Sequence, residues 1–314
     1  MTGPLDGFRV LDLSRFIAGP FCGQILGDMG ADVIKVERPG GEDARSQGPF
    51  LDGESLYAMA YNRNKSSLTL DTRNPLAGPV LERLVAWADV LIENYRPGTL
   101  AAMGLGWERL HQAYPRLVLT SLSGFGQTGP LAERPLFDPI AQAASGLMSL
   151  TGEPDGPPML AGTYIADHVA GLYGAIGTQA ALMARAWTGV GQRVDVASLD
   201  ALVSVLGTRP MAYAMLGAQS ERRGSRDPYS APANVFPTTD GHVYLHAGTD
   251  SLFPRLCAVI GRDDLAADPQ FATIASRLGN VDALEAEVAA WTSARSSDEV
   301  EAVMAAAGVP CATV

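Results

Sequence analysis

Short apolar, β-branched runs alternate with helical patterns along the N-terminal two thirds of the chain. The runs predict strands at residues 8–14, 32–38, 88–95, 116–123 and 191–198. Helical spacing of apolar residues predicts helices between them, at about 19–29, 75–87, 136–148 and 166–187. Because the strands are almost continuously apolar, the pattern indicates an α/β fold whose mostly parallel sheet is covered on both faces.

A polar stretch rich in Gly, "LGAQSERRGSRDPYSAPANVF", interrupts this alternation. We place a linker at 218–236, between a large domain at 1–217 and a smaller α+β domain at 237–314. In the smaller domain "GHVYLHAGT" predicts a strand at 241–249. Helices are expected in "SLFPRLCAVIG", "VDALEAEVAAWTSA" and "SSDEVEAVMAAAG".

Composition and charge exclude several classes of function. The net charge of −11 over 314 residues disfavours nucleic acid as a partner, since phosphate backbones bind clustered Lys and Arg. No apolar run approaches the roughly 20 residues that span a bilayer, and no signal-peptide pattern is present, so we expect no membrane partner and a cytoplasmic location. Cys22, Cys257 and Cys311 lack CxxC spacing. His242 and His246 lie about 13 Å apart on a strand, so no metal site is predicted.

The stretch "GFGQTG" at 124–129 has the spacing of a dinucleotide-binding loop and follows a predicted strand. Such a loop must lead directly into a helix whose N-terminus faces the pyrophosphate. Here "PLAERPLFDP" follows, and its second proline is incompatible with a helix starting there. We therefore interpret the stretch as a loop over a site.

Asp167 stands at the start of the predicted helix in "AGTYIADHVAGLYGAIGTQAALMA". Gly171, Gly174 and Thr178 share its helix face, so a groove for close approach of another helix or a ligand is expected there. From helix statistics alone, Asp167 would be interpreted as an N-cap. His168 points about 100° away from Asp167 and is left out of the chemistry.

An aspartate can act as a nucleophile without a base, because its carboxylate is ionised near neutral pH. Burial that raised the pKa of Asp167 to about 6 would still leave about 90% of it ionised at pH 7. A thioester is a suitable target, since a thiol of pKa about 8.5 leaves more easily than an alkoxide.

Several blocks of the sequence resemble one enzyme family. They are "PLDGFRVLDLSRFIAGPFCGQILGDMGADVIKVERPGGEDAR", "YNRNKSSLTLDTR", "ADVLIENYRPGTLAAMGLGWERL", "SGFGQTGP", "FDPIAQAASGLMSLTG" and the stretch around Asp167. In this order they resemble the class III CoA-transferases of the formyl-CoA and carnitine CoA-transferase type (CaiB/BaiF family). The resemblance implies a Rossmann-like large domain, an interlocked homodimer, and CoA or acyl-CoA as substrate with no permanently bound cofactor.

The resemblance also implies roles for particular residues. Asp167 matches the nucleophile, which attacks an acyl-CoA to give an aspartyl anhydride, then an aspartyl-CoA thioester that a carboxylic acid acceptor resolves. The positions that match CoA-binding residues are Arg38, Leu70, Asp71, Thr72, Arg73, Asn94, Tyr95, Arg96, Phe137 and Asp138. Ile17 stands where formyl-CoA transferases use a glutamine, which disfavours oxalate-like substrates. The closing "AGVPCATV" resembles a point from which members of the family continue back to the first domain.

Two alternative functions remain on the same fold. An α-methylacyl-CoA racemase would need a second proton-transfer group, for which such racemases use a histidine where Phe137 stands here. A CoA-binding protein without catalysis would use Asp167 only as a helix cap. The acyl donor and the acceptor acid are not indicated by the sequence.

Overall fold

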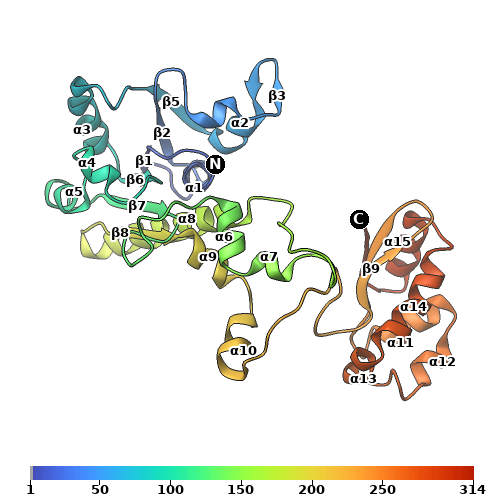
Figure 1. Ribbon diagram of the computed structural model, residues 1–314. Coiled ribbons are helices and arrows are strands. Elements are labelled where there is room, and N and C mark those ends of the chain that lie inside the picture. Colours follow the sequence, from blue (N-terminus) through green and yellow to red (C-terminus); the bar gives the residue numbers. More distant parts are fainter. Residues whose placement is uncertain (1–2) are drawn as a thin grey trace. The chain divides into compact units, whose positions relative to one another are not determined.

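The computed structural model describes residues 3–314, which divide into two compact units (Figure 1). The large unit comprises the chain up to Ser149 together with Leu160–Ser220. The small unit comprises Leu150–Met159 and Glu221–Val314. Within the small unit the Gly224 N–H donates to the Gly152 carbonyl at 3.0 Å, so the inserted decapeptide is tied to the later segment.

The large unit is built on a six-stranded parallel sheet with the order β5-β2-β1-β6-β7-β8. Its strands are β1 (Arg9–Asp12), β2 (Asp32–Glu37), β5 (Lys65–Thr69), β6 (Val90–Glu93), β7 (Val118–Ser123) and β8 (Arg193–Ala197). All strands predicted in this part of the chain are confirmed, and the sheet is parallel as expected. The strand β5 was not predicted, because "KSSLT" is polar and lies at the edge of the sheet.

Successive strands along the chain add outward from β1 in one direction and then, from β6, in the other. This is the order of a Rossmann-type sheet, and its direction reverses between β1 and β6. Ligands of open α/β sheets bind outside the carboxyl ends of the strands at such a reversal. A ligand site is therefore expected at the residues that follow β1 and β6.

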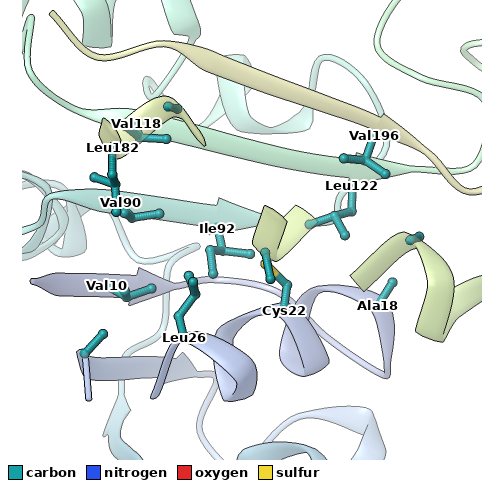
Figure 2. Close-up of a cluster of buried hydrophobic side chains, with 14 of the residues drawn as sticks. Val10, Ala18, Cys22, Leu26, Val90, Ile92, Val118, Leu122, Leu182 and Val196 are labelled. Atoms are coloured by element: carbon teal, nitrogen blue, oxygen red, sulfur yellow. The ribbon is translucent and has the colours of Figure 1, made fainter. Parts of the chain in front are cut away.

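Helices cover both faces of the sheet. On one face, α1 (Ala18–Asp28) and α8 (Ile165–Thr188) pack over Val10, Ile92 and Leu122 (Figure 2). On the other face, α3 (Gly78–Trp87), α4 (Thr99–Ala102) and α5 (Trp107–Ala113) pack over Leu11, Leu91 and Leu119. Alternate residues of one strand thus serve two cores, as expected for a sheet buried on both sides.

Shorter elements connect this framework: η1 (Asp43–Ser46), β3 (Phe50–Leu51), β4 (Glu54–Ser55), α2 (Leu56–Asn62), η2 (Pro75–Ala77), α6 (Asp138–Ala144), α7 (Leu147–Leu150), α9 (Ser198–Ser204) and α10 (Arg209–Leu216). The helix predicted at 136–148 is divided into α6 and α7. Gly146 between them has φ 87°, a left-handed conformation that ends α6.

The small unit has a three-stranded antiparallel sheet, β11-β10-β9, and five helices. Its elements are β9 (Ala233–Pro237), β10 (His242–His246), α11 (Phe253–Ile260), α12 (Asp263–Ala267), α13 (Ile274–Gly279), α14 (Val281–Thr292), α15 (Ser297–Ala306) and β11 (Cys311–Thr313). Apolar side chains from the sheet and helices, such as Phe236, Leu256 and Val288, form its own core. The strand predicted at 241–249 is confirmed as β10.

Across residues 3–314, none of the helices combines the length and the apolar character needed to cross a membrane. The cytoplasmic location stays a prediction.

Candidate active site

Helix α8 positions Asp167, but Asp167 does not cap it. The helix starts at Ile165, so Asp167 is its third residue, and the N-cap residue Tyr164 makes no capping side-chain hydrogen bond. The interpretation of Asp167 as an N-cap is therefore wrong. The reason is that Asp138, at the start of α6, already accepts the N–H groups of Ala166 (2.7 Å) and Asp167 (3.3 Å) with its Oδ2.

The predicted groove along α8 is confirmed, and α1 fills it. A Cβ on Gly171 would lie 2.8 Å from the Ala18 carbonyl oxygen and 2.9 Å from the Phe21 ring. A Cβ on Gly174 would lie 3.2 Å from Cys22 Sγ. Each interior glycine lowers helix stability by about 1 kcal/mol relative to alanine, and this close helix packing offsets that loss. The packing fixes the first turn of α8 against the loop that leads into α1.

The loop after β1 forms the opposite wall of the site. Asn94, which follows β6, accepts the Arg15 N–H at 2.8 Å and donates to the Arg15 carbonyl at 2.7 Å. The next residue, Phe16, has φ 64°, which is unusual for a residue with a side chain, and its N–H donates to Glu42 at 3.1 Å. Ile17 is buried and precedes α1. Side chains from two other loops, Asn94 after β6 and Glu42 after β2, thus hold this backbone in a single, strained shape.

Buried ion pairs lie beneath the loop. Lys65 and Asp12 pair at 2.8 Å, and Lys35 and Glu42 pair at 3.2 Å, with all four side chains almost completely buried. Burial alone would raise the pKa of Asp12, but the charges of Lys35 and Lys65 outweigh it and lower the pKa to about 2. Lys35 also donates to the Ser14 carbonyl. Members of these ion pairs therefore also bind the loop backbone, Lys35 at Ser14 and Glu42 at Phe16.

Two cavities at the carboxyl ends of the strands contain most of the residues predicted to bind CoA. One, of about 260 Å³, is lined by Asp167, Asn94, Tyr95, Arg96 and Phe137 among others. The second, of about 510 Å³, is lined by Arg38, Leu70, Asp71, Thr72 and Arg73 among others. Both are also lined by Arg15 and Tyr95, so they adjoin. Of the predicted residues, Asp138 alone lines neither, because it is buried behind Asp167.

The smaller cavity is locally positive in a strongly acidic chain. Arg15, Arg96 and Arg134 line it, while Asp167 is its only carboxylate. Arg15 pairs with Asp43 at 3.3 Å, whereas Arg96 and Arg134 form no ion pair with any of residues 3–314. Guanidinium groups of this kind favour binding of phosphate or carboxylate groups.

The pKa of Asp167 is raised to about 7, mainly by burial and further by the negative charge of Asp138. This pKa is higher than the value of about 6 considered from the sequence, because the carboxylate of Asp138 lies nearby. No residue within 3–314 donates a hydrogen bond to the Asp167 side chain. About half of these carboxyl groups are ionised at pH 7, and each ionised group is more basic than an ordinary aspartate.

Aromatic side chains on the other side of Asp167 were not predicted. Burial and the charge of Asp167 contribute to raising the pKa of Tyr57 and Tyr61, both on α2. The Tyr61 hydroxyl lies 3.2 Å from His168 Nε2, and His168 Nδ1 lies 2.6 Å from the Tyr164 carbonyl. Since a carbonyl only accepts, His168 Nδ1–H is the donor to Tyr164, and Nε2 is the ring nitrogen that meets the Tyr61 hydroxyl. The four-residue spacing in "YAMAY" was the available signal for this cluster.

The segment "GFGQTG" is a loop and no helix follows its last glycine, as predicted. Gly124 lines the cavity that contains Asp167. Within residues 3–314 there is no cluster of three or more His, Cys, Asp or Glu side chains that could hold a metal ion.

Comparison with known proteins identifies relatives along the whole chain. The sequence pattern of CoA-transferase family III matches residues 5–314. The chain is 41% identical to succinyl-CoA–D-citramalate CoA-transferase of Chloroflexus aurantiacus, over 99% of this chain and 78% of that protein. It is 45% identical to succinate–glutarate CoA-transferase of Agrobacterium fabrum, over 88% of this chain and 71% of that one. A crystal structure of a CAIB/BAIF family protein from Brucella suis superposes with a TM-score of 0.89 at 41% identity, covering 99% of this chain and 84% of that chain.

Proposed function

The chain belongs to CoA-transferase family III, and we propose that it moves CoA from an acyl-CoA to a carboxylic acid through covalent intermediates on Asp167. The observation that carries the proposal is the Asp167 carboxylate itself. It lines a cavity beside three arginines, has a pKa near 7, and accepts no hydrogen bond from residues 3–314. Such a carboxylate is basic, partly ionised and uncommitted, which suits a nucleophile.

In the proposed reaction the Asp167 carboxylate attacks the thioester carbon, and the CoA thiolate leaves to give a mixed anhydride. The thiolate then attacks the Asp167 carbonyl carbon and expels the first carboxylate, which leaves an aspartyl-CoA thioester. The acceptor carboxylate attacks this thioester to form a second anhydride and CoA thiolate. Thiolate attack on the acyl carbon of that anhydride releases the new acyl-CoA and restores Asp167. Each bond formed replaces one broken, so no further reactant is needed.

We propose that the adjoining cavities hold CoA, with its nucleotide part in the larger one. Arg38 and Arg73 line that cavity and supply positive charge for phosphate groups. Tyr95 and Arg15 lie at the shared boundary, where the Arg15 guanidinium stacks 5.5 Å from the Tyr95 ring centre. Binding of the distant nucleotide would hold the thiolate near Asp167 between the chemical steps.

A dicarboxylic acid is the acceptor that we propose to test first. The names of the two relatives include D-citramalate and glutarate, and each of these acids has two carboxylates. In this chain Arg96 and Arg134 line the cavity of Asp167 without an ion pair of their own among residues 3–314. Either guanidinium suits a carboxylate that takes no part in the reaction.

We further propose that the chain forms a homodimer through apolar side chains of α8 and α10. Large side chains there are exposed: Leu172, Tyr173, Ile176, Met183 and Trp187 on α8, and Met211, Tyr213, Met215 and Leu216 on α10. Such a concentration of exposed apolar surface is typical of a contact with another chain. Light scattering should give twice the mass of one chain, and a monomeric mass would contradict the proposal.

The covalent mechanism is tested by incubating the protein with acyl-CoAs and hydroxylamine, which converts activated carboxyls to hydroxamates. Peptide mass spectrometry should find the hydroxamate at Asp167 only when an acyl-CoA is present. Asp167→Asn should retain CoA binding and lose transfer. Exchange of the substrate α-proton without labelling would instead indicate a racemase, and CoA binding with neither reaction would indicate a non-catalytic protein.

A further inference from the structure

The first turn of α8 lacks a cap from its own sequence and receives one from α6. Asp138 Oδ2 accepts the Ala166 N–H at 2.7 Å and the Asp167 N–H at 3.3 Å, although it lies 28 and 29 positions earlier in the chain. Only 2% of Asp138 is exposed. The amide of the proposed nucleophile is therefore bound directly to a buried carboxylate of another helix.

Gln142, one turn along α6, fixes Asp138 and the segment that precedes α8. Its Nε2 donates to Asp138 Oδ1 at 2.5 Å and to the Thr163 carbonyl at 3.2 Å. Its Oε1 accepts the Ala161 N–H at 2.9 Å. Only 1% of Gln142 is exposed. Both oxygens of Asp138 are thus occupied within the protein, which leaves it unsuited to contact CoA.

We propose that Asp138, supported by Gln142, is a positioning residue that holds the first turn of α8 and tunes the charge of the Asp167 carboxylate. The inference rests on the proposed role of Asp167 as the nucleophile. It replaces the CoA contact that the sequence resemblance implied for Asp138. A carboxylate at this place does two things at once, since it orients the backbone of Asp167 and opposes ionisation of its side chain.

The effect of the Asp138 charge on the pKa of Asp167 can be separated from the effects of the other groups that face Asp167. Asp138 on α6 is the charged neighbour that raises the pKa of Asp167, after burial. The aromatic groups around it are Tyr57 and Tyr61 on α2 and Tyr164 and His168 in its own segment, and the cations of its cavity are Arg15, Arg96 and Arg134. None of these is altered when Asp138 alone is replaced by asparagine. A like charge commonly raises a neighbouring carboxyl pKa by one unit or more.

The test compares Asp138→Asn and Gln142→Met with the wild type, each as the full chain. Asparagine keeps an oxygen that can accept the two N–H groups but removes the charge. The midpoint of the pH dependence of kcat should therefore fall by about one unit. Gln142→Met removes the support without changing a charge, so kcat should fall about tenfold or more with an unchanged midpoint. KM for acyl-CoA should change little in both variants.

Asp6→Asn is the matched control, because Asp6 is exposed and precedes β1, at the sheet edge opposite the carboxyl ends of the strands. It should change neither kcat nor the midpoint. An unchanged midpoint in Asp138→Asn would overturn the inference, even if that variant were less stable, because a purely structural cap would not move it. Hydroxylamine labelling of the wild type separates the two proposals: labelled Asp167 with an unmoved midpoint defeats only this one.

Discussion

Replacing Asp167 by asparagine should stabilise the protein, and more so as the pH rises. The pKa of Asp167 is about 7 in the folded protein, against an ordinary value of 3.8. Between these two values the unfolded chain releases its proton while the folded protein retains it. The free energy of unfolding of the wild type therefore falls as the pH rises toward 7, and it levels off above that. Asparagine has a similar shape and no proton to lose.

The size of the effect follows from the separation of the two pKa values. About three pKa units correspond to roughly 4 kcal/mol once the carboxyl is ionised in both states. Part of this is already present at pH 5, where the unfolded carboxyl is mostly ionised. Between pH 5 and pH 8 the advantage of Asp167→Asn should therefore grow by about 2 to 3 kcal/mol.

The assay is urea unfolding of both proteins at pH 5, 6, 7 and 8, at one protein concentration and without CoA. Tryptophan fluorescence reports on the large unit through Trp87, Trp107 and Trp187. Asp6→Asn provides the control for loss of a negative charge. A constant difference between Asp167→Asn and the wild type over this range would refute the reasoning, because it would mean that the pKa of Asp167 is ordinary.

Three other substitutions test the framework around the site. Gly171→Ala should destabilise the protein by about 1 to 3 kcal/mol in thermal or urea unfolding, since its methyl group meets the backbone of α1, whereas Gly78→Ala, with open space around it, should not. Asn94→Ala should reduce kcat/KM for acyl-CoA at least tenfold in steady-state assays while the fold persists by circular dichroism, because the loop after β1 loses both of its bonds to this amide; an unchanged kcat/KM would show that the loop holds its shape without it. Lys65→Met should lower the free energy of unfolding by about 3 to 5 kcal/mol at pH 7, because Asp12 loses its 2.8 Å partner, and a loss below 1 kcal/mol would contradict the role given to that pair.

The sequence predicted features that depend on local pattern and missed those that depend on distant partners. The central strands were predicted because β1 and β7 place buried apolar side chains on both faces, and the glycine face of α8 indicated a close helix contact. The edge strand β5 was missed because its sequence is polar. It is held in place in part by Lys65, whose ion-pair partner, Asp12, lies on another strand.

The cap of α8 was assigned to the wrong aspartate for a similar reason. Asp167 is the acidic residue nearest the helix start, and helix statistics favour it. The actual acceptor, Asp138, is brought there by the fold and has no local signal in the sequence. The increase in the pKa of Asp167 has the same origin, because its second cause is that same distant carboxylate.

The placement of Leu150–Met159 in the small unit affects how the chain folds during translation. A ribosome delivers this decapeptide before α8 and β8, and long before the residues from Glu221 onward that bind it. The large unit can therefore complete its sheet before the residues that bind the decapeptide, from Glu221 onward, have been synthesised. A gene fragment that begins at Glu221 would lack the carbonyl of Gly156, which accepts from Arg222 at 2.8 Å. The small unit is thus not separable by a single cut in the gene, and any fragment meant to fold alone must carry residues 150–159 grafted to its start.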